Sequence, residues 1–171
     1  MIEAPKQSYI SPKVELRESH IGGTGMFCKD TIEVEELVVQ FGGTYVGKEE
    51  AEKVKRDGKI VMQWDDNLYS VEERGEDISY FINHSCDPNL WMNGSFDLVS
   101  RRKINKDEEV TIDYALFEAE ENFVSEWECN CGSEDCRGRI TGRDWERTDL
   151  QKRYKGHFSP LINKRIENLD K

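Results

Sequence analysis

Three of the five cysteines, Cys129, Cys131 and Cys136, lie within eight residues. Thiols this close together either pack as ordinary buried side chains or share a metal ion. An odd number of cysteines without a secretion signal argues against a disulfide framework. The spacing therefore predicts a tetrahedral zinc site, in which four protein ligands leave no open position and the metal is structural. The candidates for the fourth ligand are Cys28, Cys86, His84 and His157.

Negative charge is concentrated in one part of the chain. The 171 residues carry a formal net charge of −11, and residues 107–135 hold eleven acidic side chains with no lysine or arginine. An acidic chain repels phosphate backbones, so we expect no direct binding to nucleic acid. The acidic band at 107–135 either attracts a positively charged partner or forms a solvated face, and the residues alone leave both open.

The chain shows no membrane or secretion signal. Its apolar runs are a few residues long, whereas a bilayer-spanning helix needs roughly 20. Residues 1–5 lack a basic stretch followed by an apolar one, which predicts an intracellular protein, cytoplasmic or nuclear. No pattern indicates an oligomeric state, which we leave open.

Alternation of apolar and polar residues predicts a mainly β domain of about one unit. Strands are expected around Val14 and Leu16, at 37–41, less cleanly at 59–64, and at 110–116, where Ile112 and Tyr114 would share one face. Helices are expected at 48–56, after the Ser159-Pro160 pair and, more weakly, across 144–154.

Two polar motifs are candidates for a ligand site. Gly22-Gly23-Thr24-Gly25 lacks the apolar strand that precedes a dinucleotide fingerprint, so a tight turn fits it better than a ligand loop. Residues 83–89, Asn-His-Ser-Cys-Asp-Pro-Asn, surround a cysteine with polar groups that need partners if they are buried. Taken alone, the second motif fits a buried hydrogen-bonded turn or a ligand site equally well.

Residues 83–89 also closely resemble the Asn-His-Ser-Cys-x-Pro-Asn signature of the SET-domain protein-lysine methyltransferases. Three further segments resemble motifs of this family and occur in its order: 23–27 (Gly-Thr-Gly-Met-Phe), 108–114 (Glu-Glu-Val-Thr-Ile-Asp-Tyr) and the post-SET zinc motif at 129–138. The resemblance implies a SET fold, mainly β, with several short sheets, a pseudoknot-like threading, short helices and a zinc-bound C-terminal segment. It suggests a SET domain at 14–115 and a post-SET zinc segment at 116–142. The helices expected in the remaining residues predict a C-terminal helical extension at 143–171.

The same resemblance implies methyl transfer from S-adenosylmethionine to the ε-amine of a lysine. By resemblance, Tyr114 is the catalytic tyrosine, which orients the amine and the sulfonium. The implied cofactor contacts are Gly22, Gly23, Thr24, Gly25, Asn83 and His84. The implied zinc ligands are Cys86, Cys129, Cys131 and Cys136, which leaves Cys28 as a core thiol.

A free lysine has a pKa near 10.4, so the enzyme must strip water from the amine before it can attack. Phe41, Ile112 and Phe117 are the expected apolar walls of such a channel. Ile112 stands where relatives often have Phe or Tyr and lacks a hydroxyl to hold a water, which predicts di- or trimethylation. Phe41 stands where many relatives have a channel tyrosine, and Ser79-Tyr80 stand where many have arginine before Phe-Ile-Asn-His.

The acidic band is expected to border the peptide groove and to attract a basic protein or peptide that carries the target lysine. This predicts a histone-like protein or another chromatin protein as substrate. Two alternatives stay open at this point: a lysine methyltransferase of a non-histone protein, and a noncatalytic SET-like interaction module.

Overall fold

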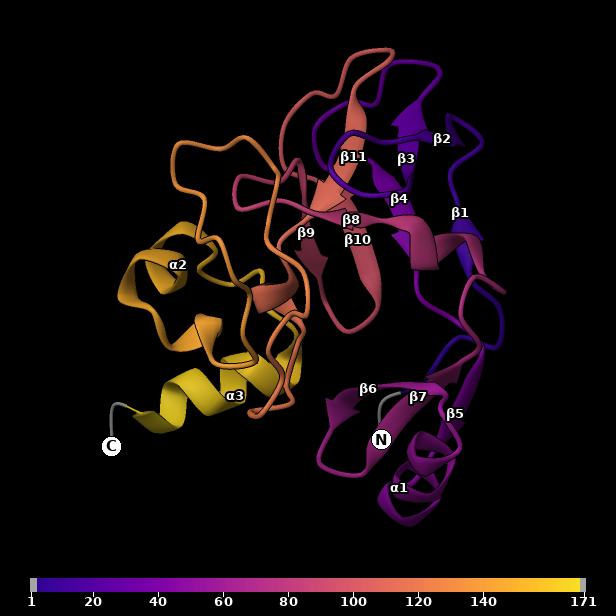
Figure 1. The fold of residues 1–171 in the computed structure, drawn as a ribbon, viewed down its shortest axis with the longest axis vertical. Helices are drawn as coiled ribbons and strands as arrows, with labels where there is room; N and C mark the ends of the chain where they lie inside the picture. The colour runs from indigo at the N-terminus through magenta and orange to yellow at the C-terminus, as the bar shows by residue number, and fades with distance from the viewer. Residues whose placement is uncertain (1–2, 170–171) are drawn as a thin grey trace.

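The computed structural model of the chain describes residues 3–169. Its strands form three small sheets, with the orders β1-β4-β10-β9, β2-β3-β11-β8 and β5-β7-β6 (Figure 1). The strands are β1 (Tyr9–Ile10), β2 (Val14–Glu18), β3 (Thr24–Cys28), β4 (Leu37–Gln40), β5 (Thr44–Val46), β6 (Ile60–Asp65), β7 (Leu68–Glu72), β8 (Asn83–His84), β9 (Leu90–Asn93), β10 (Asp97–Ser100) and β11 (Glu109–Ile112). The helices are α1 (Lys48–Arg56), α2 (Thr148–Arg153) and α3 (Pro160–Leu169), with 3-10 turns at Ile78–Phe81, Tyr114–Leu116 and Asp144–Glu146. The predicted mainly β fold of short sheets and short helices is confirmed.

The second sheet positions the polar motifs. β2 and β3 form an antiparallel hairpin, and its turn closes through a bond from the Ser19 N–H to the Gly23 carbonyl at 2.8 Å. Gly23 has φ of +53°, a left-handed conformation that glycine adopts readily, so the predicted tight turn is confirmed. β11 pairs with β3 on one side and with β8, in parallel, on the other. The parallel pair sets Thr111 opposite Asn83 and Ile112 opposite His84.

The strand expected at 110–116 ends earlier than the alternation predicts. β11 stops at Ile112, and the carboxylate of Asp113 accepts a hydrogen bond from the N–H of Ala115 at 3.0 Å. This side-chain cap starts the 3-10 turn at Tyr114–Leu116, so Ile112 and Tyr114 do not share one strand face. The expectation was wrong because an aspartate cap competes with the strand at this point.

The positions of the helices agree more closely with the expectations from the sequence. α1 occupies 48–56 as predicted, with Glu49 and Glu50 in its first turn and basic residues in its last. α3 begins at Pro160, and the Ser159 hydroxyl caps it by accepting from the N–H of Ile162 at 3.3 Å. The weaker helix expected at 144–154 is broken into a 3-10 turn and α2, because Arg147 adopts an extended backbone. Residues 170 and 171 of the expected extension lie outside the described residues.

Most of the apolar side chains form one large core under the three sheets. At its centre the fully buried Trp64 lies 5.2 Å from Phe41 and 5.3 Å from Phe96, measured between ring centroids. A second, small cluster joins Cys86, Cys129 and Ile140. The segment that carries this small cluster runs as loops beside β11, drawn in orange in Figure 1.

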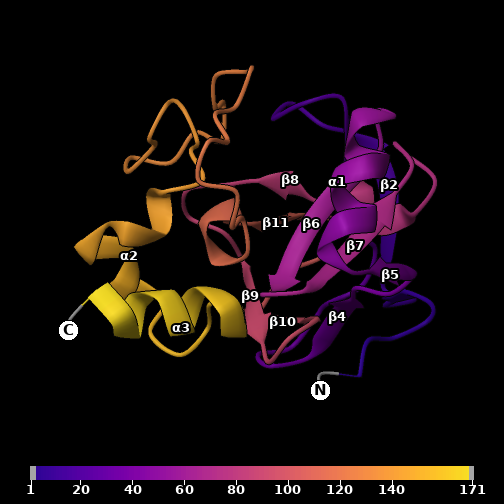
Figure 2. The ribbon, with the colours of Figure 1, turned by 90° about the horizontal axis from the view of Figure 1, so that it is seen from below.

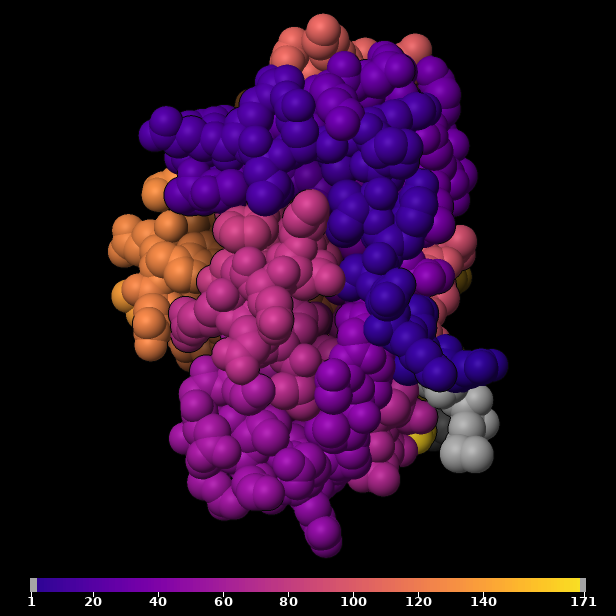
Figure 3. Space-filling view, turned by 90° about the vertical axis from the view of Figure 1, so that its right-hand side faces the viewer, coloured from indigo at the N-terminus to yellow at the C-terminus, as the bar shows by residue number. Residues whose placement is uncertain are grey.

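The helices lie at the edges of this arrangement. Figure 2 shows α2 and α3 together on one side of the sheets and α1 on the other. On the face in Figure 3, the N-terminal strands (indigo) form the upper part and the region from α1 to β7 (purple to magenta) the lower part. Across residues 3–169, no helix has the length and apolar content needed to cross a membrane.

Candidate functional site

Tyr114 lies directly after β11, where the 3-10 turn begins. Its hydroxyl donates to the carbonyl of Ile82 at 3.0 Å, and its backbone N–H donates to Nδ1 of His84 at 3.2 Å. Burial raises the pKa of the Tyr114 phenol well above its usual range, so the phenol keeps its proton at neutral pH. Tyr114 is thus held at its backbone N–H and at its hydroxyl, and it presents a neutral O–H group.

Two cavities meet at Tyr114. The first, called here the glycine-side cavity, has a volume of about 460 Å³ and is lined by Gly22, Asn83, His84, Tyr114 and Trp127, among others. The second, called the aromatic cavity, measures about 330 Å³ and is lined by Phe41, Ile82, Ile112, Tyr114 and Phe117, among others. Among the described residues that line them, only Tyr114 belongs to both walls.

Three of the four residues of the glycine turn border open space. Gly22 lines the glycine-side cavity, and an adjoining hollow of about 310 Å³ is lined by Gly22, Gly23 and Thr24. Gly25 lines neither, and a Cβ atom there would lie 2.2 Å from Oε1 of Glu109. A side chain at position 25 would therefore displace the end of the Glu109 side chain, which packs against β3.

Asn83 holds the glycine turn in place. Its Nδ2 lies within hydrogen-bond distance of the carbonyls of Gly22 and Thr24, both at 3.3 Å, and donates to Oε1 of Glu109 at 2.7 Å. The other oxygen of Glu109 accepts from the Ser19 hydroxyl at 2.8 Å. Reasoning from the sequence missed Glu109 as a partner, although its place in the 108–114 motif was a usable signal.

His84 is buried and its ring already has two partners. Because Nδ1 accepts from the Tyr114 N–H, the ring proton lies on Nε2, which is 3.3 Å from Sγ of Cys86. Burial lowers the pKa of His84 to about 4, so the ring is neutral near pH 7. This arrangement makes His84 a link between Tyr114 and Cys86 and leaves no ring nitrogen free to act as a base.

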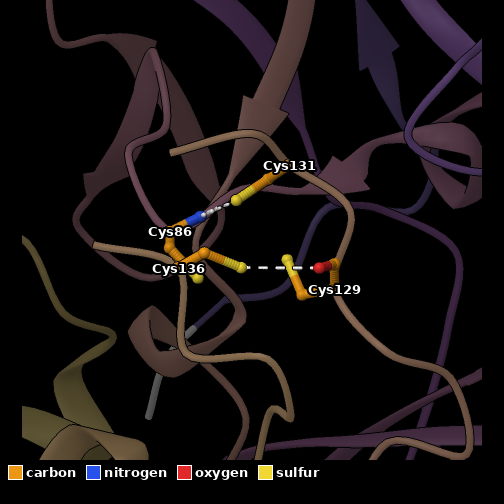
Figure 4. A group of neighbouring side chains, drawn as sticks. All are labelled: Cys86, Cys129, Cys131 and Cys136. Atoms are coloured by element: carbon orange, nitrogen blue, oxygen red, sulfur yellow. Dashed lines mark hydrogen bonds between the residues drawn. The ribbon is translucent and has the colours of Figure 1, made fainter. Parts of the chain in front are cut away.

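Four cysteines gather beside His84, and we call them the cysteine cluster: Cys86, Cys129, Cys131 and Cys136 (Figure 4). Their sulfur atoms all lie within 4.8 Å of one another. A tetrahedral zinc ion with Zn–S bonds of about 2.3 Å needs sulfur atoms about 3.8 Å apart, so the donor set fits such an ion. The backbone N–H of Arg137 donates to Sγ of Cys86 at 3.3 Å, a contact that favours a thiolate at this position.

Of the other candidates for a fourth ligand, His84 lies beside the cluster with Nε2 3.3 Å from Sγ of Cys86, whereas Cys28 and His157 lie elsewhere. Cys28 is fully buried in the large core, where burial raises its thiol pKa to about 11. The ring of His157 stacks on Trp91 with 3.5 Å between the centroids. The convergence of Cys86 with the three clustered cysteines is therefore confirmed as geometry, whereas metal binding stays a prediction.

The walls expected for a lysine channel come together in the aromatic cavity. The rings of Tyr114 and Phe117 lie 5.7 Å apart, and those of Phe41 and Phe117 lie 5.9 Å apart. Ile112 lines the same cavity although it belongs to a different element from Tyr114. All three expected channel residues thus line the same cavity as Tyr114.

Reasoning from the sequence also missed Trp127. Trp127 is 43% exposed. The centroid of its ring lies 6.3 Å from that of Tyr114 and 6.0 Å from that of His84. Trp127 forms part of the wall of the glycine-side cavity. A lone tryptophan two residues before the clustered cysteines was a weak signal, because its position depends on how that loop folds back.

Charged side chains of both signs line the aromatic cavity: Glu72, Glu118 and Glu120 together with Lys55, Lys59 and Arg74. Glu72 and Glu118 line it, and burial raises the pKa of both side chains. Neither has a lysine, arginine or histidine nitrogen within ion-pair distance in the part of the chain described by the structure. Glu120 lines the same cavity and pairs with Lys55 from α1 at 2.5 Å.

Comparison with known protein families identifies the SET domain over residues 23–115, more than half of the chain. Histone-lysine N-methyltransferase trithorax of Drosophila virilis is 31% identical over 132 residues, which cover 70% of this chain and 3% of that protein. Histone-lysine N-methyltransferase 2B of Homo sapiens is 31% identical over 138 residues, which cover 72% of this chain and 5% of that protein. The chain therefore corresponds to a small part of these curated relatives.

Among solved structures, the methyltransferase domain of human Histone-lysine N-methyltransferase SETMAR aligns with a TM-score of 0.62 at 19% sequence identity. The alignment covers 75% of this chain and 58% of that chain. At this level of identity the likeness concerns the fold.

Proposed function

This chain belongs to the SET-domain family, and on that basis we propose that it is a protein-lysine N-methyltransferase that uses S-adenosylmethionine. The observation that carries the proposal is the meeting of two cavities at Tyr114. A transferase needs its two substrates to approach one point from separate sites, and a single polar side chain stands at that junction.

The glycine-side cavity is the proposed cofactor site. Its volume lies within the range of sites for small molecules, and its walls offer main chain at Gly22, polar groups at Asn83 and His84, and an aromatic face at Trp127. Gly23 and Thr24 would contribute main chain from the adjoining hollow, and Gly25 would keep the turn close to β11. When bound, S-adenosylmethionine supplies a methyl group activated by its sulfonium charge.

The aromatic cavity is the proposed lysine channel. Phe41, Ile112 and Phe117 exclude water from an entering side chain, and loss of water lowers the pKa of a lysine amine towards the neutral form. The Tyr114 hydroxyl, held by the Ile82 carbonyl, then orients the amine. Because the phenol keeps its proton at neutral pH, its role is to position groups and not to act as the base.

The cysteine cluster is the proposed structural zinc site. The four cysteines would hold the ion through their thiolates and would leave no position for a water or a substrate. The metal would fasten the loops at 123–141 against β8 and β11, next to both cavities. The cluster therefore supports the site without taking part in the reaction.

The proposed substrate is a basic protein that carries the target lysine, histone-like or another chromatin protein. Support comes from the unpaired carboxylates of Glu72 and Glu118 in the channel wall, which a cationic peptide would neutralise. The names of the relatives, histone-lysine N-methyltransferases, point the same way. Such a substrate implies an intracellular protein, whether cytoplasmic or nuclear.

The test is transfer of labelled methyl groups from S-adenosylmethionine to a panel of basic proteins. Replacing Tyr114 by Phe removes the hydroxyl and keeps the ring, so kcat should fall by about 100-fold or more while cofactor binding is retained. Tyr9→Phe, an exposed tyrosine on β1, is the matched control and should leave kcat unchanged. Cofactor binding without transfer to any lysine would instead indicate a noncatalytic SET-like interaction module.

A further inference from the structure

Arg137 joins the cysteine cluster to the turn that carries Tyr114. It follows Cys136 directly, and its backbone N–H donates to Sγ of Cys86 at 3.3 Å. Its side chain is only 5% exposed and reaches Asp113, which directly follows β11. The main chain and the side chain of one residue therefore contact two different parts of the site.

The guanidinium of Arg137 holds two buried carboxylates. Nη1 and Nη2 donate to the two oxygens of Asp113 at 2.8 and 2.6 Å, and Nε donates to Oδ2 of Asp144 at 2.9 Å. The Asp113 side chain has no exposed surface. The planar fork of arginine can satisfy this geometry, whereas the single ammonium of lysine cannot satisfy it.

Asp113 in turn fixes the start of the 3-10 turn. Its Oδ1 accepts from the N–H of Ala115 at 3.0 Å, and its Oδ2 accepts from the hydroxyl of the fully buried Tyr154 at 3.2 Å. Tyr114 stands between Asp113 and Ala115, so a rotation of the Asp113 carboxylate would turn the Tyr114 backbone and move its ring. No other side chain that the structure describes binds both oxygens of Asp113.

We propose that Arg137 is a positioning residue that couples the filling of the cysteine cluster by a metal to the placement of the Tyr114 hydroxyl. The inference rests on the proposed function, which assigns the metal to the cluster and the reaction to Tyr114. A filled cluster fixes Cys86 and Cys136, and with them the backbone of Arg137. When the metal leaves, that backbone is released, Asp113 loses its partner, and a buried unpaired charge forces the turn to rearrange.

The test replaces Tyr114 site-specifically by 3-fluorotyrosine and follows its ¹⁹F resonance in the full chain with zinc bound and after stripping by a chelator. In the otherwise unchanged protein, stripping should move the resonance. In Arg137→Lys and Arg137→Gln the resonance should be displaced with zinc bound, and stripping should move it by less than about half as much. Arg143→Gln is the matched control, because the Arg143 side chain comes from the same part of the chain and pairs with Glu146 instead. It should behave as the unchanged protein.

A turnover measurement separates positioning from folding. Arg137→Lys should keep its zinc and stay folded, with a lower unfolding temperature because buried bonds to Asp113 and Asp144 are lost. At a temperature where it is folded, kcat should be lowered about 10-fold and KM for the cofactor should stay within about twofold. An Arg137→Lys resonance that coincides with that of the unchanged protein, or that responds equally to stripping, overturns the coupling. If Arg137→Gln does not fold, Arg137→Lys alone decides. The ¹⁹F result is independent of methyl transfer, so an inactive protein would contradict the proposed function and leave this test readable.

Discussion

Ile112 is the residue on which the number of methyl groups transferred should depend. It is buried in the wall of the aromatic cavity and offers no hydroxyl near Tyr114. An amine that already carries a methyl group needs room beside the phenol, and an apolar wall leaves that room free of bound water. The side chain at position 112 thus controls space and not the chemistry of transfer.

Replacing Ile112 by Tyr should restrict the products to monomethyl-lysine, because the larger side chain fills the cavity and its hydroxyl can hold a water. The unchanged protein should yield di- or trimethyl-lysine at long reaction times, and Ile112→Val should do so too. Mass spectrometry of a peptide substrate measures the distribution. Monomethyl-lysine alone from the unchanged protein would contradict this assignment of Ile112.

The site residues that the sequence could predict are those within its short motifs. Asn83 and His84 form β8, Ile112 ends β11, and Tyr114 begins the 3-10 turn that follows. The parallel pairing of β8 with β11 therefore brings all four close together. Arg137 and Trp127 could not be placed from the sequence. Their positions depend on how the loops at 116–142 fold back, and no local pattern fixes that path.

The loops that carry the cysteine cluster and the sheets are stabilised by different apolar clusters. Their small apolar cluster, centred on Cys86, Cys129 and Ile140, is separate from the large core around Trp64. Removing a metal from the cluster should therefore loosen these loops and leave the sheets folded.

Chelation of zinc should raise the rate of amide hydrogen exchange at 123–141 by about 10-fold or more and leave exchange in β4 and β10 unchanged. Cys86→Ser should reproduce the effect without chelator, whereas Cys28→Ser should not, because Cys28 belongs to the large core. Mass spectrometry of exchanged fragments gives the measurement. Equal exchange with and without chelator would show that no metal fastens these loops.

Local sequence patterns predict some element boundaries in this fold and miss others. α1 begins and ends at the predicted residues and α3 begins where predicted, because the terminal charges of α1 and the Ser159 cap of α3 act within a few positions. The strand predicted at 110–116 stops at Ile112 because the Asp113 carboxylate caps the turn that follows. Arg137, which lies 24 residues further along the chain, holds that carboxylate in place. Alternation cannot reveal a contact of that kind. The pseudoknot-like threading also depends on contacts between distant parts of the chain, and it stays a prediction.

At the scale of the whole molecule, the acidic band should act by attracting its substrate. Turnover on a basic peptide at low concentration should fall several-fold between low and moderate ionic strength, mainly through a rise in KM. Glu118→Gln should raise KM and weaken the salt dependence, while Glu167→Gln on the exposed face of α3 should change neither.

The pH dependence follows from the same carboxylate. Burial raises the pKa of Glu118, so its charge is lost at a higher pH than that of an ordinary glutamate. KM for the basic peptide should therefore rise on acidification in the unchanged protein and much less in Glu118→Gln. If turnover were the same at low and moderate ionic strength, the acidic band would serve solubility and would not attract the substrate.

The strand order has a consequence for how the chain is made. β3 lies between β2 and β11, and β4 lies between β1 and β10. The second partner of each strand, β11 for β3 and β10 for β4, is therefore synthesised much later than the strand itself. Until Glu109–Ile112 has left the ribosome, one edge of β3 presents unpaired backbone groups to other nascent chains. The growing polypeptide is thus most prone to aggregate just before β11 emerges, and a pause in translation at that point would prolong the hazard.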